Sequence, residues 1–152
     1  QIPYHRRRIG VVFQNHQLLF DRSVFDNIAL PLQICGFDPA DAARRARAAL
    51  DKVGLLSKEK LNPVVLSGGE QQRVAIARAF ASQPKILFAD EPTGNLDAET
   101  GRVISNLLFE LNEREGTTLV LVTHDHKLAN RCQRQLVMES GMVLGARLTV
   151  EG

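Results

Sequence analysis

The sequence is poor in cysteine, in net charge and in long apolar runs, and each shortage excludes a class of protein. Its two cysteines, Cys35 and Cys132, lie far apart and form no metal-ligand spacing, which indicates reduced, partly buried thiols in a cytosolic protein. No apolar run approaches the ~20 residues that a bilayer-spanning helix needs. The formal net charge of +2 gives no argument for a nucleic-acid partner, and we expect none.

The chain also lacks the features of a complete secreted precursor. It begins at Gln1 instead of a methionine and has no signal-peptide pattern. Its 152 residues, 44% hydrophobic and 24% charged, suffice for one domain with a core or for part of a larger domain. We expect the chain to be a segment of a longer protein.

Short apolar runs separated by helix signals predict an α/β fold. Strands are expected at residues 8–13, 85–90 and 117–124, and the last two are typical of parallel strands buried on both faces. An all-helical insert at about 23–82 interrupts the pattern, so that the α/β core comprises 8–14 and 83–152 of one partial domain, 1–152.

Local signals give the expected helix ends. Ser23 can cap a helix that Pro31 should kink or end. Asp38 and Pro39 begin a second helix, which Gly54 stops because glycine tolerates the left-handed conformation that follows a helix. Further elements are a helix from about Glu70 to Ala81, a helix with an apolar stripe at 104–111 that Gly116 closes, a short helix from about His126 and a closing hairpin with a turn at Gly141.

The stretch LSGGE, residues 66–70, has the composition of an anion site. Ser67, Gly68 and Gly69 precede a helix whose first backbone N–H groups have no partner within the helix and carry a partial positive charge. Glycines let an anion approach this backbone, and the serine hydroxyl adds a donor. The alternative is an ordinary capped helix, which would explain Ser67 but not two consecutive glycines.

Polar side chains follow two of the predicted strands where they end. Asp90 and Glu91 end the strand at 85–90, and His124 ends the next strand. Ligands of α/β sheets bind at the carboxyl ends of the strands. Two adjacent acids there suit Mg²⁺ binding and activation of a water, and a histidine can contact a phosphate oxygen. A lone histidine at a strand end is more often structural, so the functional interpretation of His124 depends on the presence of Asp90 and Glu91.

Five motifs together resemble one family. VVFQ, LSGGE, ILFADE, GNLD and VTHD follow the order of the Q-loop, signature, Walker B strand, D-loop and H-loop in the nucleotide-binding domain of ABC transporters. The resemblance covers nearly the whole chain. It implies a P-loop NTPase-type parallel sheet with an inserted helical signature subdomain.

The resemblance also implies roles at the chain's own ATP and Mg²⁺ site. Gln14 resembles the glutamine that reaches Mg²⁺ and the attacking water, and Asp90 the metal-side carboxylate. Glu91 resembles the catalytic base, and His124 the switch histidine at the γ-phosphate.

A second group resembles the residues that act across a dimer. Ser67, Gly68, Gly69 and Glu70 resemble the signature, which grips the γ-phosphate of ATP held by the other subunit. Asp97 resembles the D-loop aspartate that crosses the dimer interface. The anion expected at LSGGE is therefore a nucleoside triphosphate that belongs to the partner's site.

The implied protein is the ATP-hydrolysing subunit of an ABC membrane complex, peripheral at the cytoplasmic face of the inner membrane. Its partners would be a second copy, forming a homodimer, and a permease-type membrane subunit near Gln14–Phe25.

ADEPTGNLD resembles a branch of lipoprotein-releasing, macrolide-exporter and cell-division ATPases, which remain alternatives. A soluble ABC ATPase of translation or DNA repair is the competing hypothesis. The short distance from Gln14 to Leu66 excludes the long coiled-coil insertion of chromosome-type members.

One motif of this family is missing. The P-loop pattern G-x-x-x-x-G-K-[ST] fits no stretch of the chain, and GMVLGAR at 141–147 ends on arginine near the wrong terminus. The resemblance therefore implies that the family's N-terminal strands and P-loop are absent from these residues.

Overall fold

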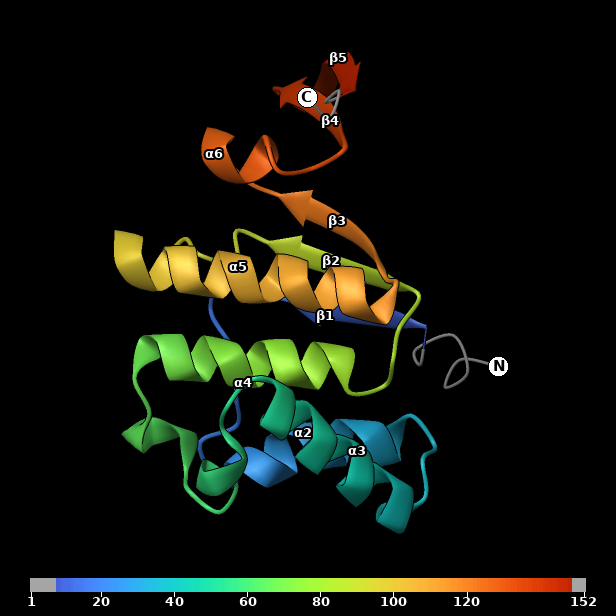
Figure 1. The fold of residues 1–152 in the computed structure, drawn as a ribbon, viewed down its shortest axis with the longest axis vertical. Helices are drawn as coiled ribbons and strands as arrows, with labels where there is room; N and C mark the ends of the chain where they lie inside the picture. The colour runs from blue at the N-terminus through green and yellow to red at the C-terminus, as the bar shows by residue number, and fades with distance from the viewer. Residues whose placement is uncertain (1–7, 149–152) are drawn as a thin grey trace. The chain divides into compact units, whose positions relative to one another are not determined.

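The computed structural model describes residues 8–148, which form two units, one ending at Val122 and the other beginning at Thr123. The helices and strands are labelled in Figure 1. Within the described residues, no helix combines the length and the apolar composition needed to cross a bilayer.

The first unit contains a parallel sheet of three strands. Its strands are β1 (Ile9–Val12), β2 (Ile86–Asp90) and β3 (Thr118–Val122), in the order β1-β2-β3. Val12 pairs with Ala89, and Asp90 pairs with Val122, so all three strands end at the same edge. The three strands expected from the sequence are confirmed, although each is shorter than its apolar run.

One face of this sheet is covered and the other is not. Leu87 and Ala89 are buried in one cluster with Ile104 and Leu108 of α5 (Ala98–Glu115). On the other face, Phe88 is 41% exposed. The expectation that β2 and β3 are buried on both faces is therefore wrong. Successive side chains of a strand point to opposite faces, and the described helices cover only one of them.

The segment between β1 and β2 is helical, and its caps follow from the sequence. It contains α2 (Val24–Ile34), α3 (Pro39–Lys52), α4 (Gly68–Phe80) and two 3-10 turns, η1 (Leu56–Lys58) and η2 (Pro63–Val65). Ser23 caps α2 by accepting a hydrogen bond from the Asp26 N–H, and Asp38 caps α3 in the same way. Gly54, just past α3, has a φ of +75°, which glycine adopts without strain.

Pro31 does not end α2. The helix continues to Ile34, and the Cys35 N–H donates to the Pro31 carbonyl at 3.0 Å. Proline removes one backbone donor, but Ile28 and Leu32 on either side of it are buried at 0% and 3% exposure. Their burial stabilises the helix and compensates for the hydrogen bond that proline cannot donate.

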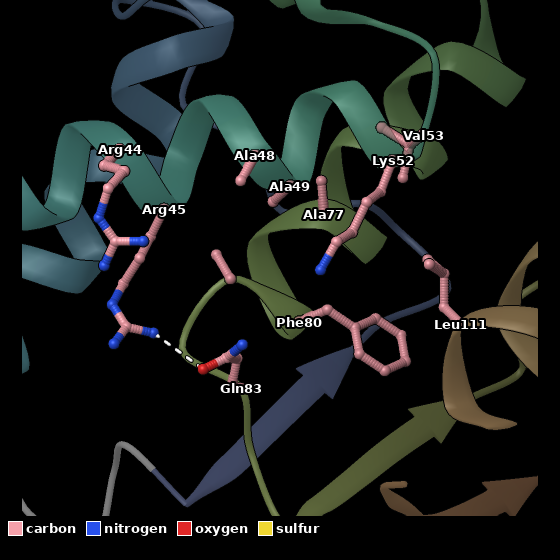
Figure 2. A pocket seen from close by; sticks show the side chains of 11 residues that line it. Arg44, Arg45, Ala48, Ala49, Lys52, Val53, Ala77, Phe80, Gln83 and Leu111 are labelled. Atoms are coloured by element: carbon pink, nitrogen blue, oxygen red, sulfur yellow. Dashed lines mark hydrogen bonds between the residues drawn. The ribbon is translucent and has the colours of Figure 1, made fainter. Parts of the chain in front are cut away.

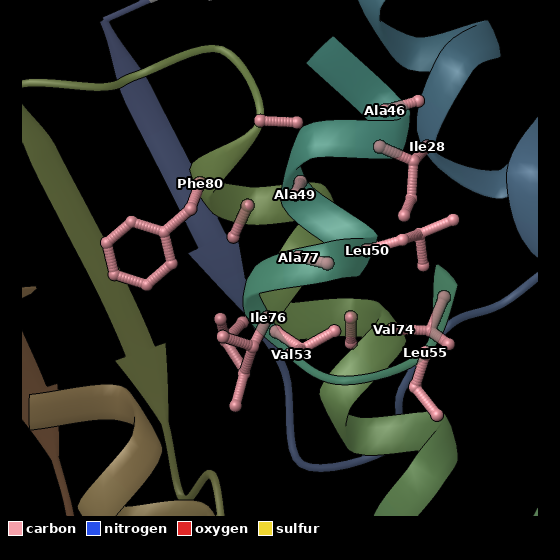
Figure 3. Packing of buried hydrophobic residues seen from close by; sticks show 14 of the residues in the cluster. Ile28, Ala46, Ala49, Leu50, Val53, Leu55, Val74, Ile76, Ala77 and Phe80 are labelled. Atoms are coloured by element: carbon pink, nitrogen blue, oxygen red, sulfur yellow. The ribbon is translucent and has the colours of Figure 1, made fainter. Parts of the chain in front are cut away.

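The helical segment and the sheet share one hydrophobic core. Figure 3 shows Ile28 of α2 and Leu50 of α3 packed near Val74 and Ile76 of α4. The same cluster includes Leu87 of the sheet. The division into a helical insert at 23–82 and an α/β core at 8–14 and 83–152 therefore stays a prediction, and 1–7 and 149–152 lie outside the described residues.

The second unit is small. It contains α6 (His126–Ala129) and the antiparallel hairpin of β4 (Arg134–Glu139) and β5 (Met142–Leu148). Gly141 turns the chain between the two strands with a φ of +78°. The short helix and the hairpin expected from the sequence are confirmed.

Candidate functional site

Asp90 and Glu91 stand where β2 ends. Asp90 is exposed, and Glu91 is half-buried with its N–H donating to the Val122 carbonyl at 2.8 Å. Glu91 has a φ of +43°, a conformation uncommon for residues other than glycine. Strained backbone of this kind is concentrated at functional sites. The hydrogen bond to β3 holds the carboxylate-bearing residue at the edge of the sheet.

Gln14 lies against the loop that follows Glu91. Its Nε2 donates to Asn95 Oδ1 at 3.2 Å, and Asn95 Nδ2 donates to the Gln14 carbonyl at 3.3 Å. This exchange fixes the orientation of both amides and leaves Gln14 Oε1 without a hydrogen-bond donor among the described residues. A Cβ on Gly94 would lie 2.6 Å from Gln14 Nε2, so a larger residue there would displace the Gln14 amide.

Helix α4 begins with a capping box. Ser67 Oγ accepts from the Glu70 N–H at 3.1 Å, and the Glu70 carboxylate accepts from the Ser67 N–H at 3.1 Å. Glu70 is also paired with Lys58. The hydrogen bond from Lys58, followed by that from the Ser67 backbone, holds the pKa of Glu70 below its usual value. The carboxylate of Glu70 is thus engaged within the chain, and its nucleotide role stays a prediction.

The two glycines of this helix start differ. The helix begins at Gly68, earlier than the expected start near Glu70, because Ser67 supplies the cap. A Cβ on Gly69 would lie 2.6 Å from Thr100 Cγ2, whereas one on Gly68 would lie 3.6 Å from Leu96 Cδ2, an ordinary contact. Packing therefore explains Gly69 but not Gly68. The N–H groups of both have no acceptor among residues 8–148, as an anion site requires.

Asp97 caps α5 close to that helix start. Its side chain accepts from the Thr100 N–H at 3.1 Å. Hydrogen bonds from the Thr100 side chain and then the Thr100 backbone hold the pKa of Asp97 below its usual value. Asp97 is thus ionised at neutral pH and has a structural role whether or not it crosses an interface.

The contacts above assign the predicted residues of the first unit to two groups. Gln14, Asp90 and Glu91 form an edge group at the carboxyl ends of β1 and β2. Ser67, Gly68, Gly69, Glu70 and Asp97 form a helix-start group where α4 meets α5.

The family follows from comparison with known proteins. A family model described as "ABC transporter" matches residues 1–94, which include Gln14, the signature stretch and Glu91. The chain belongs to the ABC transporter family.

Individual relatives agree with this assignment. The chain is similar to the cell division ATP-binding protein FtsE of Escherichia coli K12, with 51% identity over 146 residues that cover 95% of the chain and 65% of FtsE. It is 48% identical over 141 residues to the lipoprotein-releasing system ATP-binding protein LolD of Syntrophus aciditrophicus, covering 93% of the chain and 63% of LolD. The chain thus spans about 65% of the length of the curated relatives it matches.

A solved structure has the same fold. The ATP-binding cassette MJ0796, in a dimeric post-hydrolysis state bound to ADP and Pi, matches with a TM-score of 0.83 and 37% identity over 99% of this chain and 67% of that one. The resemblance inferred from the five motifs and the α/β fold of ABC ATPase cassettes are confirmed.

Mg²⁺ is implied by this family, and the edge group fits it. Mg²⁺ is usually held by one or two carboxylates together with substrate phosphates. Asp90 and Gln14 Oε1 offer oxygen ligands of this kind. No group of three or more His, Cys, Asp or Glu side chains gathers as metal ligands in the part of the chain that is described. The donor set therefore suits a metal shared with a phosphate, not one bound by protein ligands alone.

His124, the switch histidine of the family resemblance, belongs to the second unit. It is exposed and lies between Thr123 and Asp125, whose N–H donates to Thr123 Oγ1 at 3.0 Å. Asp125 also caps α6 by accepting from the N–H groups of Lys127 and Leu128. His124 and Glu91 belong to different units, so a role of His124 beside Glu91 stays a prediction.

A cavity away from both groups is not a nucleotide site. It has a volume of about 100 Å³, is shown in Figure 2, and has Ala49, Phe80 and Leu111 among its lining residues. Ligand pockets measure roughly 300–1,000 Å³, and no residue of the two groups lines this one.

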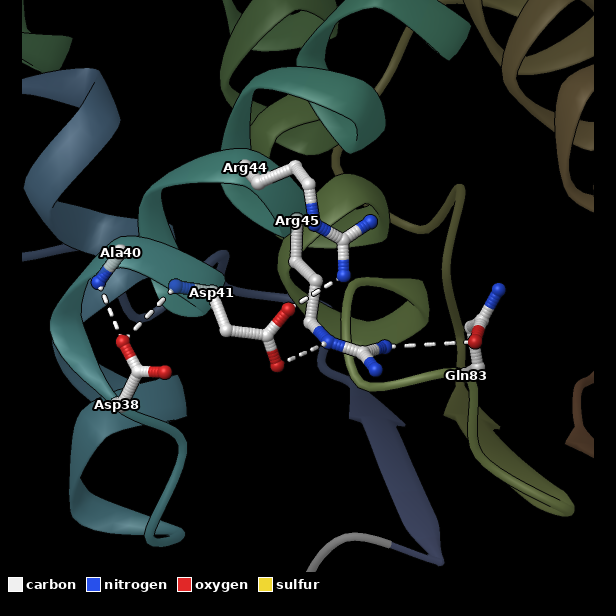
Figure 4. A network of polar contacts seen from close by, with 6 residues as sticks. All are labelled: Asp38, Ala40, Asp41, Arg44, Arg45 and Gln83. Atoms are coloured by element: carbon white, nitrogen blue, oxygen red, sulfur yellow. Dashed lines mark hydrogen bonds and ion pairs between the residues drawn. The ribbon is translucent and has the colours of Figure 1, made fainter.

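The arginines near that cavity are engaged in ion pairs. Figure 4 shows Asp41 between Arg44 and Arg45, and Arg45 Nη1 donating to Gln83 Oε1 at 3.3 Å. Hydrogen bonds from Arg45 and then Arg44 hold the pKa of Asp41 below its usual value. Asp41 thus pairs with both arginines at the surface of α3.

Sequence reasoning missed two residues of the site. Asn95 and Gly94 lie within the quoted motif GNLD, but neither was singled out. Their roles depend on Gln14, 81 residues from Asn95 in the sequence. No local pattern signals a contact of that range.

Proposed function

We propose that the whole protein is the ATP-binding and ATP-hydrolysing subunit of an ABC membrane complex. It couples ATP-driven dimerisation to export, lipoprotein release or mechanical transmission to the periplasm. The observation that carries the proposal is the edge group. Asp90, Glu91 and Gln14 all lie where β1 and β2 end, at the same edge of the sheet. FtsE and LolD, whose names include cell division and a lipoprotein-releasing system, support it.

Each residue of the edge group has a chemical task in this proposal. Bound Mg²⁺ would neutralise charge on the β- and γ-phosphates. Asp90 and the amide oxygen of Gln14 would hold that metal, and Gln14 would also contact the attacking water. Glu91 orients the water and accepts its proton, since a carboxylate beside the γ-phosphate is the basic group at this edge.

The helix-start group serves a second copy of the chain. The N–H groups of Gly68 and Gly69 and the Ser67 hydroxyl donate to the γ-phosphate of ATP bound to the partner. The dimeric state of MJ0796 with ADP and Pi supports this arrangement. Asp97, ionised and fixed by Thr100, would contact the partner's site across the interface.

A membrane subunit has a candidate contact beside Gln14. Leu18 is buried, whereas Leu19 and Phe20 are 51% and 52% exposed. Asn27 holds this segment by accepting from the Leu19 N–H at 2.7 Å and donating to the Leu19 carbonyl at 3.0 Å. An ordered loop with two exposed apolar side chains suits a short cytoplasmic helix of a permease-type subunit. The protein then works as a peripheral subunit at the cytoplasmic face of the inner membrane.

Replacing Leu19 and Phe20 with serine tests that contact. We expect the double variant to bind the membrane subunit at least about tenfold more weakly, because it lacks two apolar side chains that the complex would bury. The ATPase of the isolated subunit and its melting temperature should stay near wild type. Ile34→Ser, at a side chain that is 69% exposed, is the matched control. Unchanged co-purification and stimulation of turnover would place the contact elsewhere.

Replacing His124 with alanine tests the switch role. We expect the turnover of the full-length protein to fall at least about tenfold, because the γ-phosphate loses a hydrogen-bond partner and the water its alignment. His126→Ala, an exposed histidine two residues later, should leave turnover unchanged. Phosphate release under saturating MgATP measures both. Equal rates for the two variants would make His124 structural.

The proposal as a whole is tested by purifying the full-length protein from membranes. We expect it to hydrolyse MgATP and to co-purify with an integral membrane subunit, identified by mass spectrometry. Recovery with ribosomes or DNA-repair proteins instead would support the soluble alternative, which FtsE and LolD do not favour.

A further inference from the structure

Gln72 is a fully buried polar side chain at 0% exposure, on the fifth residue of α4. Its Nε2 donates to the Pro92 carbonyl at 2.6 Å and to the Phe13 carbonyl at 3.4 Å. Its Oε1 lies 2.6 Å from His16 Nδ1. One buried amide thus connects α4 to two segments that are distant from it in the sequence.

These two segments are the ones that carry the edge group. Phe13 immediately precedes Gln14, and Pro92 immediately follows Glu91. Gln72 therefore holds the backbone next to the metal-side amide and the backbone next to the catalytic base. The helix that holds them begins with the signature, so the same element carries the helix-start group.

The hydrogen bonds of Gln72 decide which nitrogen of His16 carries hydrogen. Both donors of the Gln72 amide point to carbonyl oxygens, which can only accept. Its Oε1 therefore faces His16, and His16 Nδ1 must be the donor. The neutral imidazole of His16 is then held as the Nδ1–H tautomer.

A second contact holds the same segment to α4. Arg78 donates to the His16 carbonyl at 2.8 Å and to the Gln17 carbonyl at 2.9 Å. Gln17 has a φ of +50°, a conformation that side-chain-bearing residues adopt when their surroundings hold them there. The segment that leads from Gln14 to Leu19 is thus held by two residues of α4, Gln72 and Arg78.

We propose that Gln72 and His16 are positioning residues for ATP hydrolysis. Together they tie the segment that carries Gln14 and the membrane-subunit contact to the backbone that carries Glu91. Displacement of that segment moves Glu91 through the amide of Gln72, which is fully buried and therefore acts through the backbone that it holds. This inference rests on the proposed function, and part of its test does not require hydrolysis.

The kinetic test uses full-length variants. Gln72→Leu should lower kcat about tenfold with KM for ATP within about twofold, because misplaced catalytic groups slow chemistry without weakening binding. Gln71→Leu is the matched control, since Gln71 Nε2 donates to the Pro63 carbonyl at 2.9 Å, outside the edge group. Its kcat should stay within about twofold of wild type. Equal effects of the two variants on kcat and on melting temperature would overturn the proposal.

Variants of the half-buried His16 keep the test valid if Gln72→Leu fails to fold. Asparagine can present an N–H where Nδ1 stood, whereas leucine cannot. We expect His16→Leu to lower kcat about fivefold and His16→Asn to restore at least half of the wild-type value. Equal kcat in the two variants would contradict a role for the hydrogen bond.

The spectroscopic test is independent of ATPase activity. Long-range ¹H–¹⁵N NMR of histidine-labelled protein, at about pH 8 where imidazole is ordinarily neutral, should show His16 protonated at Nδ1. In Gln72→Leu, or in Gln72→Ala if that variant fails to fold, the Nε2–H form should gain. A wild-type His16 protonated only at Nε2 would overturn the inference. A wild-type protein with the expected tautomer but no hydrolysis would overturn the proposed function instead.

Discussion

Glu91→Gln is expected to lower ATP hydrolysis by the full-length protein about 100-fold or more, the scale of losing a positioned general base. Glutamine keeps the shape of the side chain but cannot accept the proton of the attacking water. The backbone of residue 91 is held by its N–H bond to the Val122 carbonyl, which the substitution retains. ATP binding and ATP-driven dimerisation should therefore persist, and the dimer should become long-lived because its ATP is not consumed.

Phosphate release and size-exclusion chromatography with MgATP measure the two effects. Glu110→Gln is the matched control, because it makes the same chemical change at an exposed position of α5. Its turnover should equal that of wild type. If Glu91→Gln turned ATP over at a near-normal rate, the base would have to be another residue and the edge group would serve binding alone.

The 152-residue chain by itself is expected to bind MgATP far more weakly than micromolar and not to hydrolyse it. An affinity of 1 μM requires about 8 kcal/mol. The sequence contains no P-loop, and the helix-start group offers one helix N-terminus with a hydroxyl, which contributes only a fraction of that energy. The apolar sheet face, where Phe88 is 41% and Val122 56% exposed, should also make the isolated chain poorly stable.

Titration calorimetry and phosphate release measure this prediction on two proteins. The first is the chain alone, and the second carries in addition the P-loop segment of FtsE at its N-terminus. The extended protein should gain micromolar affinity, steady turnover and a higher melting temperature. Micromolar binding or steady hydrolysis by the shorter protein would show that the phosphate site is built from other residues.

The sequence alone predicted what depends on neighbouring residues. Ser23, Asp38 and Ser67 cap helices because a short polar side chain reaches the backbone N–H two or three residues ahead. Gly116 ends α5 in the left-handed conformation for an equally local reason. The order of strands and helices, the position of the acids at a strand end and the resemblance to the ABC family follow from the same short-range patterns.

The tertiary structure decided what depends on segments distant in sequence. It showed that Gly69 is required by Thr100, that the Gln14 amide is oriented by Asn95, and that Gln72 is a buried connection instead of one more polar helix residue. It also corrected the burial of β2, since an apolar run does not indicate how many of its faces are covered. Such properties belong to pairs of packed elements, and a hydrogen bond across 20 to 81 residues exists only once both partners are in place.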